Sequence, residues 1–200
     1  MAFCVLCHQR PPRRHCPALK ADICAPCCGE ERERTVQCPF NCEHLLQARE
    51  REPVYELPTD FPNLDLDPHE RFLRSQEPLL LTMVGMLFIA AVRTEAMDLD
   101  VREALAGMIR ERRSLPGEVI GEAAQAFAVE FQMRFDEFSA KALVEAEGKS
   151  MFHDRDVLLI LAFFQREEMH YNNRRPKSRA YVDWLRGWMT QMAAGTNPVA

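Results

Sequence analysis

All eight cysteines of this 200-residue chain fall within its first 42 residues, and most of them are grouped in close pairs. Two pairs have the spacing Cys-x2-Cys and a third has Cys-x3-Cys, and cysteines so spaced on a tight turn can bind the same ion. The cysteines are Cys4, Cys7, Cys16, Cys24, Cys27, Cys28, Cys38 and Cys42. A segment of about 50 residues cannot bury enough apolar surface to fold unaided, so these side chains must supply a crosslink.

Metal binding is the crosslink that we expect. The first residues, Met1 to Cys7, lack the basic start, apolar stretch and cleavage site of a secretory signal. We therefore expect a cytoplasmic protein, in which thiols stay reduced and bind metal in preference to forming disulfides. Eight thiolates match two tetrahedral zinc ions. Each structural zinc would contribute roughly 10–16 kcal/mol to folding.

The spacing divides the ligands into two interleaved sets. Neighbouring side chains in an extended segment point to opposite faces, so adjacent Cys27 and Cys28 are expected to serve different ions. Imidazole also suits zinc, which makes His15 or His44 an alternative to Cys28. A redox role for the adjacent thiols is a further alternative. The first ion is assigned Cys4, Cys7, Cys24 and Cys27, and the second Cys16, Cys28, Cys38 and Cys42.

The order of these ligands resembles a known class of zinc module. Over residues 1–48 the pattern is similar to the cross-brace fingers of the HIT, MYND and B-box kind, and Cys16-Pro17 is similar to the Cys-Pro of the HIT finger. Where that family has a second cysteine shortly afterwards, this chain has Ala18 and Leu19. The same string resembles the start of uncharacterised bacterial cysteine-rich proteins. The resemblance to cross-brace fingers implies a module that contacts other proteins.

The rest of the chain divides by composition. We take residues 1–52 as the zinc-binding module. Residues 53–68 contain four prolines, which disfavour helix and predict an extended connector lying against the next domain. Residues 69–194 are expected to form an α-helical bundle, and residues 195–200 a loose tail.

Apolar periodicity in residues 69–194 predicts helices. A short helical turn is expected at 69–75, then five helices over about 78–96, 98–115, 120–148, 154–171 and 178–194. The apolar run Leu79 to Val92 is shorter than the roughly 20 residues of a membrane span, so we expect a core helix. The predicted fold is mainly α: a small two-zinc finger followed by a five-helix bundle.

For function, the leading hypothesis is a non-enzymatic adaptor that makes protein–protein contacts. The last predicted helix carries Tyr181, Trp184 and Trp188 on one stripe, which either packs onto the bundle or binds a partner. An enzyme with an unrecognised site is a third hypothesis. Glu167-x2-His170 has the spacing of half a di-iron site, but no second copy of that motif accompanies it in residues 69–200.

The second hypothesis is a nucleic-acid-associated regulator. Its candidate contacts are Arg10, Arg13, Arg14 and Lys20 in the zinc-binding module. The chain as a whole has a formal net charge of −5, and residues 1–52 hold eight Lys/Arg against seven Asp/Glu. Phosphate affinity depends on dense positive charge, so this hypothesis ranks below the adaptor.

Overall fold

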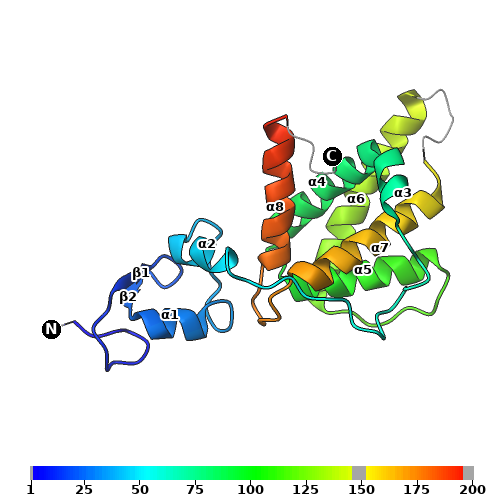
Figure 1. Cartoon of the computed structure of the whole chain (residues 1–200). Coiled ribbons are helices and arrows are strands. Elements are labelled where there is room, and N and C mark those ends of the chain that lie inside the picture. Colours follow the sequence, from blue (N-terminus) through cyan, green and yellow to red (C-terminus); the bar gives the residue numbers. More distant parts are fainter. Residues whose placement is uncertain (1, 146–151, 196–200) are drawn as a thin grey trace.

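The structure is a computed structural model that describes residues 2–145 and 152–195. A small N-terminal module and a larger helical part lie at opposite ends of the molecule (Figure 1). The module contains β1 (Arg14–Cys16), β2 (Ala21–Ile23), α1 (Ala25–Glu31) and α2 (Glu43–Arg49). The helical part contains α3 (Glu70–Ser75), α4 (Glu77–Arg93), α5 (Asp98–Arg112), α6 (Glu122–Glu145), α7 (Asp154–Tyr171) and α8 (Ala180–Ala193). The mainly helical fold confirms the fold prediction.

The module has little apolar interior. Strands β1 and β2 pair antiparallel, with Arg14 opposite Ile23. The buried apolar side chains are cysteines plus Ile23, Val36 and Leu45. Burying an aliphatic side chain contributes about 2 kcal/mol, whereas ordering each residue costs about 1–2 kcal/mol. Three aliphatic side chains therefore cannot hold this module together, and the cysteines must.

The bundle has a conventional core. α5 packs against α6 and α7, and α4 packs against α6 and α8. Large side chains at three- and four-residue steps meet there, among them Phe127 and Phe131 of α6 and Phe164 of α7, all fully buried. The predicted end of α6 near Gly148 lies outside the described residues. Across the part of the chain that is described, no helix combines the length and apolarity needed to cross a membrane.

Two acidic residues at the start of α5 have different roles. Asp100 caps α5, because its Oδ2 accepts the Met97 N–H at 2.8 Å. Asp98 is fully buried and accepts Ser178 Oγ at 2.5 Å and the Tyr181 N–H at 3.2 Å. Burial raises the pKa of the Asp98 carboxyl to about 6, although these hydrogen bonds oppose the shift. Asp98 therefore joins α5 to the start of α8.

The connector, residues 53–68, lies against the helical part. The Tyr55 N–H donates to the His170 carbonyl at 3.0 Å, and Phe61 is buried. Arg166 of α7 donates to the Leu66 carbonyl at 2.6 Å. These contacts confirm the expected position of the connector on a domain surface. They also show that His170 is used to hold the connector.

Candidate metal centres

The first predicted set of cysteines is brought together. The Sγ atoms of Cys4, Cys7, Cys24 and Cys27 all lie within 4.8 Å of one another, and Cys7 and Cys24 are 3.9 Å apart. A tetrahedron with Zn–S bonds of about 2.3 Å has sulfur atoms about 3.8 Å apart. None of the eight cysteines is in a disulfide. These four thiols can therefore hold one metal ion.

Local structure places these ligands. In the turn after Cys4, the His8 N–H donates to the Cys4 carbonyl at 2.8 Å, and the Cys4 N–H donates to the Arg10 carbonyl at 2.9 Å. Cys24 immediately precedes α1, and Cys27 lies in the first turn of that helix. The β1–β2 hairpin between the two pairs folds the second pair back onto the first.

Backbone donors prepare this site for thiolates. Burial raises the pKa of the Cys4 thiol, but hydrogen bonds from the backbone of Cys24, Cys7 and Leu6 outweigh it and lower the pKa to about 6. A depressed thiol pKa favours the thiolate, which is the form that binds metal. The pKa of Cys7 is lowered too, chiefly by backbone hydrogen bonds, whereas a hydrogen bond with Cys24 raises the pKa of Cys27. A cation among the four sulfur atoms would favour the thiolate form of all of them.

The second predicted set lines one small cavity. Cys16, Cys28, Cys38 and Cys42 surround a volume of about 20 Å³. A volume of roughly 10–15 Å³ holds one water molecule, so the cavity has the size of a single small occupant. Among the described residues, however, only the first set has its thiols within 4.8 Å of each other. The second set shares a cavity without the compact spacing of the first.

The walls of this second cavity also include His15 and His44. The His44 Nδ1 atom is buried and has no hydrogen-bond partner. The His15 Nδ1 atom, in contrast, lies 2.9 Å from Asp22 Oδ1 at an exposed position. A buried nitrogen without a partner is costly unless something binds it. Of the two alternatives to Cys28, His44 therefore presents an unsatisfied ligand atom.

The geometric reason given for separating Cys27 from Cys28 is wrong. Both residues lie in α1 and not in an extended segment. Consecutive residues of an α-helix point about 100° apart around its axis. Cys27 also lines the second cavity, but its Sγ atom lies with the first set, whereas Cys28 lines the second cavity and is not part of that set.

The four predicted nucleic-acid contacts have different surroundings. The Arg10 guanidinium forms a hydrogen bond with Cys24, which raises the pKa of Arg10. Arg13 and Lys20 are exposed. Arg14 lines a cavity that contains none of the other three. The structure therefore does not gather these residues around one site.

The aromatic stripe of α8 packs onto the bundle. Tyr181 is fully buried, so it offers no surface to a partner. The Trp184 ring centroid lies 5.0 Å from that of Tyr171 and 5.4 Å from that of Tyr181. Trp188 is half-buried and contacts Phe163 at 6.3 Å between ring centroids. Of the two alternatives for this stripe, packing onto the bundle applies to Tyr181. Partner binding by Trp184 and Trp188, which are both partly exposed, stays a prediction.

Sequence reasoning missed a buried network that joins the module to the helical part. Glu33, 1% exposed, accepts Arg49 Nη2 at 2.5 Å, Asn173 Nδ2 at 2.8 Å and the Arg179 N–H at 3.0 Å. The Glu33 carbonyl accepts the Lys177 N–H at 2.8 Å. The module is thereby fixed to the segment between α7 and α8.

Two further arginines support this junction. Arg175 Nη1 donates to the Gly29 carbonyl at 3.1 Å and to the Arg32 carbonyl at 2.5 Å. The Arg179 guanidinium lies 3.9 Å from the centroid of the Phe40 ring. The run Glu30-Glu-Arg-Glu-Arg34 has the composition of a solvated loop, so nothing local in the sequence marks Glu33 as buried.

A cavity of about 490 Å³ lies between the connector and α5. Its charged side chains are mostly engaged: Arg102 binds Glu168, and the Glu103 carboxylate accepts the Gly121 N–H at 3.0 Å. Glu118 pairs with Arg110 outside the cavity lining. These interactions hold the connector and helices in place, and they leave no converging set of free acid and base groups among the described residues that line the cavity.

Comparison with protein-family models, with curated proteins and with solved structures found no match to this chain.

Proposed function

We propose that this protein is a non-enzymatic zinc-binding adaptor whose N-terminal module presents a surface to a protein partner. The observation that carries the proposal is the cluster of four thiols at Cys4, Cys7, Cys24 and Cys27. Four thiolates with no open position are typical of structural zinc, not catalytic zinc. The resemblance to cross-brace fingers supports the same class of module.

A second zinc ion is part of the proposal. Cys16, Cys38 and Cys42 would supply three ligands, and His44 the fourth, because its buried Nδ1 atom has no other partner. Burial raises the pKa of the Cys38 thiol to about 11, and the nearby charges of Glu33, Cys42 and Cys16 add to this shift. A divalent cation would offset that accumulation of negative charge.

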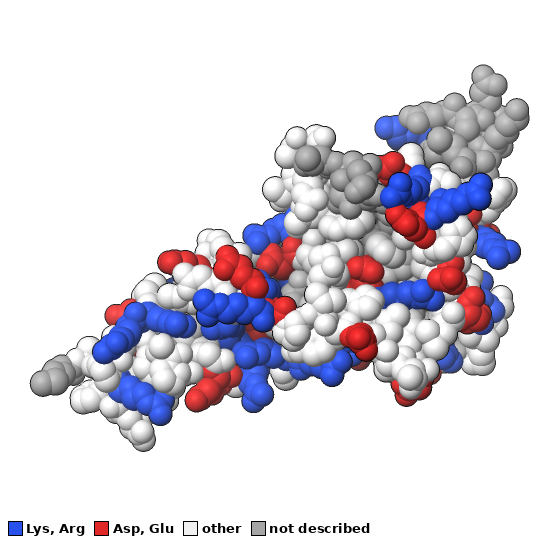
Figure 2. Space-filling view, viewed as in Figure 1, with Lys and Arg blue, Asp and Glu red and all other residues white. Residues whose placement is uncertain are grey.

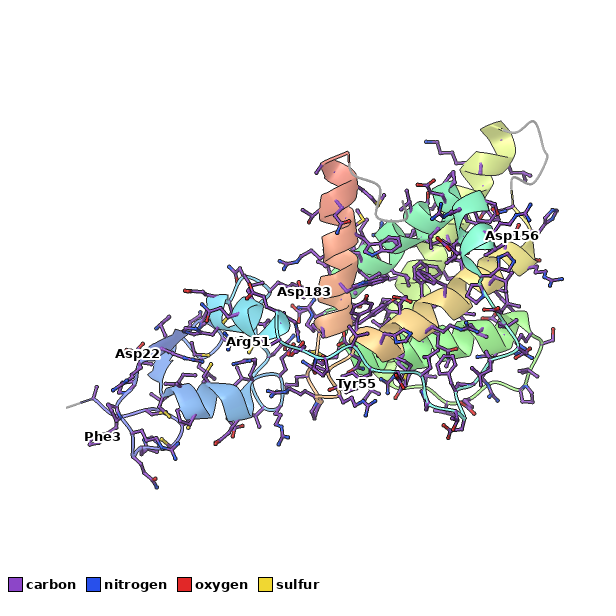
Figure 3. All side chains as sticks on the ribbon, in the orientation of Figure 1. Phe3, Asp22, Arg51, Tyr55, Asp156 and Asp183 are labelled. Atoms are coloured by element: carbon purple, nitrogen blue, oxygen red, sulfur yellow. The ribbon has the colours of Figure 1, made fainter. Side chains whose placement is uncertain are left out.

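The proposed partner surface surrounds the first metal site. Phe3, Val5 and Leu6 are 56%, 43% and 37% exposed, although all three are apolar. Phe3 lies at the end of the module that faces away from the bundle (Figure 3). Exposed apolar residues grouped on one surface are typical of a contact with another protein. The metal would fix the turn that carries them.

The junction gives this surface a defined orientation. Because Glu33 and Arg175 attach the module to the segment between α7 and α8, the partner surface is held at a fixed position relative to the bundle. An adaptor that holds its partner in one geometry needs such a junction. The remaining hypotheses, a nucleic-acid-associated regulator and an enzyme, have no equivalent support from the site.

The test is affinity purification of the full chain from its native host, with three forms compared. A defined protein should be recovered by the wild type and lost by the double variant Phe3→Ser, Leu6→Ser. The control Val129→Ser changes a side chain that is 58% exposed on α6 and should leave recovery unchanged. Equal recovery by all three forms, or recovery that nuclease treatment abolishes, would contradict the proposal.

A further inference from the structure

A basic cavity lies beside the junction, on a face that the adaptor proposal does not use. Its volume is about 330 Å³. We name it the four-arginine pocket after Arg14, Arg32, Arg51 and Arg175, which line it with His44, Gln47, Ala48 and Glu52. Three parts of the chain therefore meet there. They are β1 together with the end of α1, the end of α2, and the segment between α7 and α8. In Figure 2, Lys and Arg side chains gather where the module meets the helical part, and Figure 3 labels Arg51 there.

Most of these guanidinium groups are uncommitted. Within the described part of the chain, the side chains of Arg14, Arg32 and Arg51 form no hydrogen bond or ion pair. The Arg32 Nε atom is also buried, so water does not satisfy it. Arg175 is held in position by the Gly29 and Arg32 carbonyls. The pocket thus contains hydrogen-bond donors that lack acceptors.

The pocket also lacks compensating negative charge. Glu52 is its one acidic lining residue among those described, and its carboxylate binds Arg49 Nη1 at 2.6 Å and Asn173 Nδ2 at 2.9 Å. Four guanidinium groups around one small volume repel each other unless an anion lies between them. Both the unsatisfied donors and the excess positive charge therefore indicate an anionic ligand.

We propose that the four-arginine pocket binds a phosphate monoester. A phosphate monoester has three terminal oxygens and nearly two negative charges at neutral pH, and guanidinium groups bind such oxygens in pairs. A carboxylate has only two oxygens and one charge, so it would leave some of the guanidinium N–H donors of the pocket without an acceptor. The volume is at the lower end for small-molecule sites, which accommodates a phosphate with a small organic group.

The test uses phenyl phosphate as the probe and isothermal titration calorimetry on the full chain. The wild type should bind one equivalent saturably. Arg51→Gln and Arg14→Gln should each weaken binding at least about tenfold, because each removes a charge-assisted hydrogen bond. Arg51 is exposed and without a partner among the described residues, so its variant should fold normally. Circular dichroism and zinc content should be the same in every form.

The matched control is Arg13→Gln, which removes the same charge one residue before β1 but outside the pocket. Its affinity for phenyl phosphate should equal that of the wild type. Acetate at equal concentration should not compete. Absence of saturable binding, or equal weakening by Arg13→Gln, would overturn the proposal. If a single-stranded oligonucleotide without a terminal phosphate bound more tightly than phenyl phosphate, that result would also overturn the proposal, in favour of a surface that binds phosphodiesters.

Discussion

The buried carboxylate of Glu33 is the group on which the junction most depends, and Glu33→Ala tests this. The substitution removes the acceptor of three hydrogen bonds, from Arg49, Asn173 and the Arg179 N–H. Arg49 and Asn173 each retain Glu52 as a second acceptor, at 2.6 Å and 2.9 Å respectively. The Arg179 N–H has no second acceptor among the residues that the structure describes, so it would be left unpaired.

These contacts set the expected magnitude. Removing one partner of a buried ion pair costs about 3–5 kcal/mol, and each hydrogen bond to a charged group contributes about 1.5–3 kcal/mol. Because two of the three donors keep an acceptor, we expect a loss of about 3 kcal/mol. Glu33→Gln keeps Oε1, the atom that accepts from both Arg49 and Arg179, and should lose about half as much.

Urea unfolding followed by tryptophan fluorescence measures this loss. Both tryptophans lie in α8, and Trp184 lines a cavity with Arg49 at the junction. Glu30→Ala is the control, because Glu30 is an exposed residue of the same type, three positions before Glu33 and near the end of α1. Zinc content should be unchanged. If Glu33→Ala shifted the midpoint no more than Glu30→Ala does, the junction would not depend on this carboxylate.

Three further predictions concern the metal sites and the bundle. Cys7→Ser should unfold the module while most of the helical circular-dichroism signal remains, because α1 and α2 have only seven residues each; a complete loss of helix would contradict this. His44→Ala should remove the second zinc, whereas Cys28→Ala should retain it; metal analysis showing the reverse would reassign the ligand to Cys28. Asp98 has a pKa raised from 3.8 to about 6, so the folded state favours its protonated form. Its contribution to stability is full below about pH 4 and declines as the pH rises through 6, by about 1 kcal/mol between pH 5 and 7. Asp98→Asn should be more stable relative to the wild type at pH 7 than at pH 5 in urea unfolding, and a constant difference would refute the shift.

The parts of this protein that the sequence predicts are those governed by local spacing. In α6, Phe127, Phe131 and Phe135 repeat every four residues, which fixes both the helix and its buried face. The Cys4/Cys7 and Cys24/Cys27 pairs are each positioned by one tight turn, so their spacing alone indicates a shared ion. Periodicity and ligand spacing are properties of a few neighbouring residues, so they do not depend on contacts between distant segments.

The parts that the sequence does not predict join distant segments. Glu33 and Asn173 are 140 positions apart, and neither has a distinctive neighbourhood. The four-arginine pocket combines Arg14 and Arg51 of the module with Arg175 of the helical part. Proximity in the sequence groups Arg14 with Arg10, Arg13 and Lys20, whereas the fold places it beside Arg32, Arg51 and Arg175. An aspartate at the start of a helix commonly caps it, so the sequence suggests that Asp98 caps α5. Only tertiary packing directs Asp98 to α8 instead.

Metal content measured on the intact protein by native mass spectrometry tests the central claim most directly, namely that thiolate-bound zinc holds the module together. We expect two zinc ions per chain in the wild type. We expect none in Cys7→Ser, because its module unfolds, and one in His44→Ala, because His44 lines the second cavity and is not among the first four thiol ligands. Fewer than one zinc per chain in carefully purified wild-type protein, or a disulfide among the eight cysteines, would contradict the account.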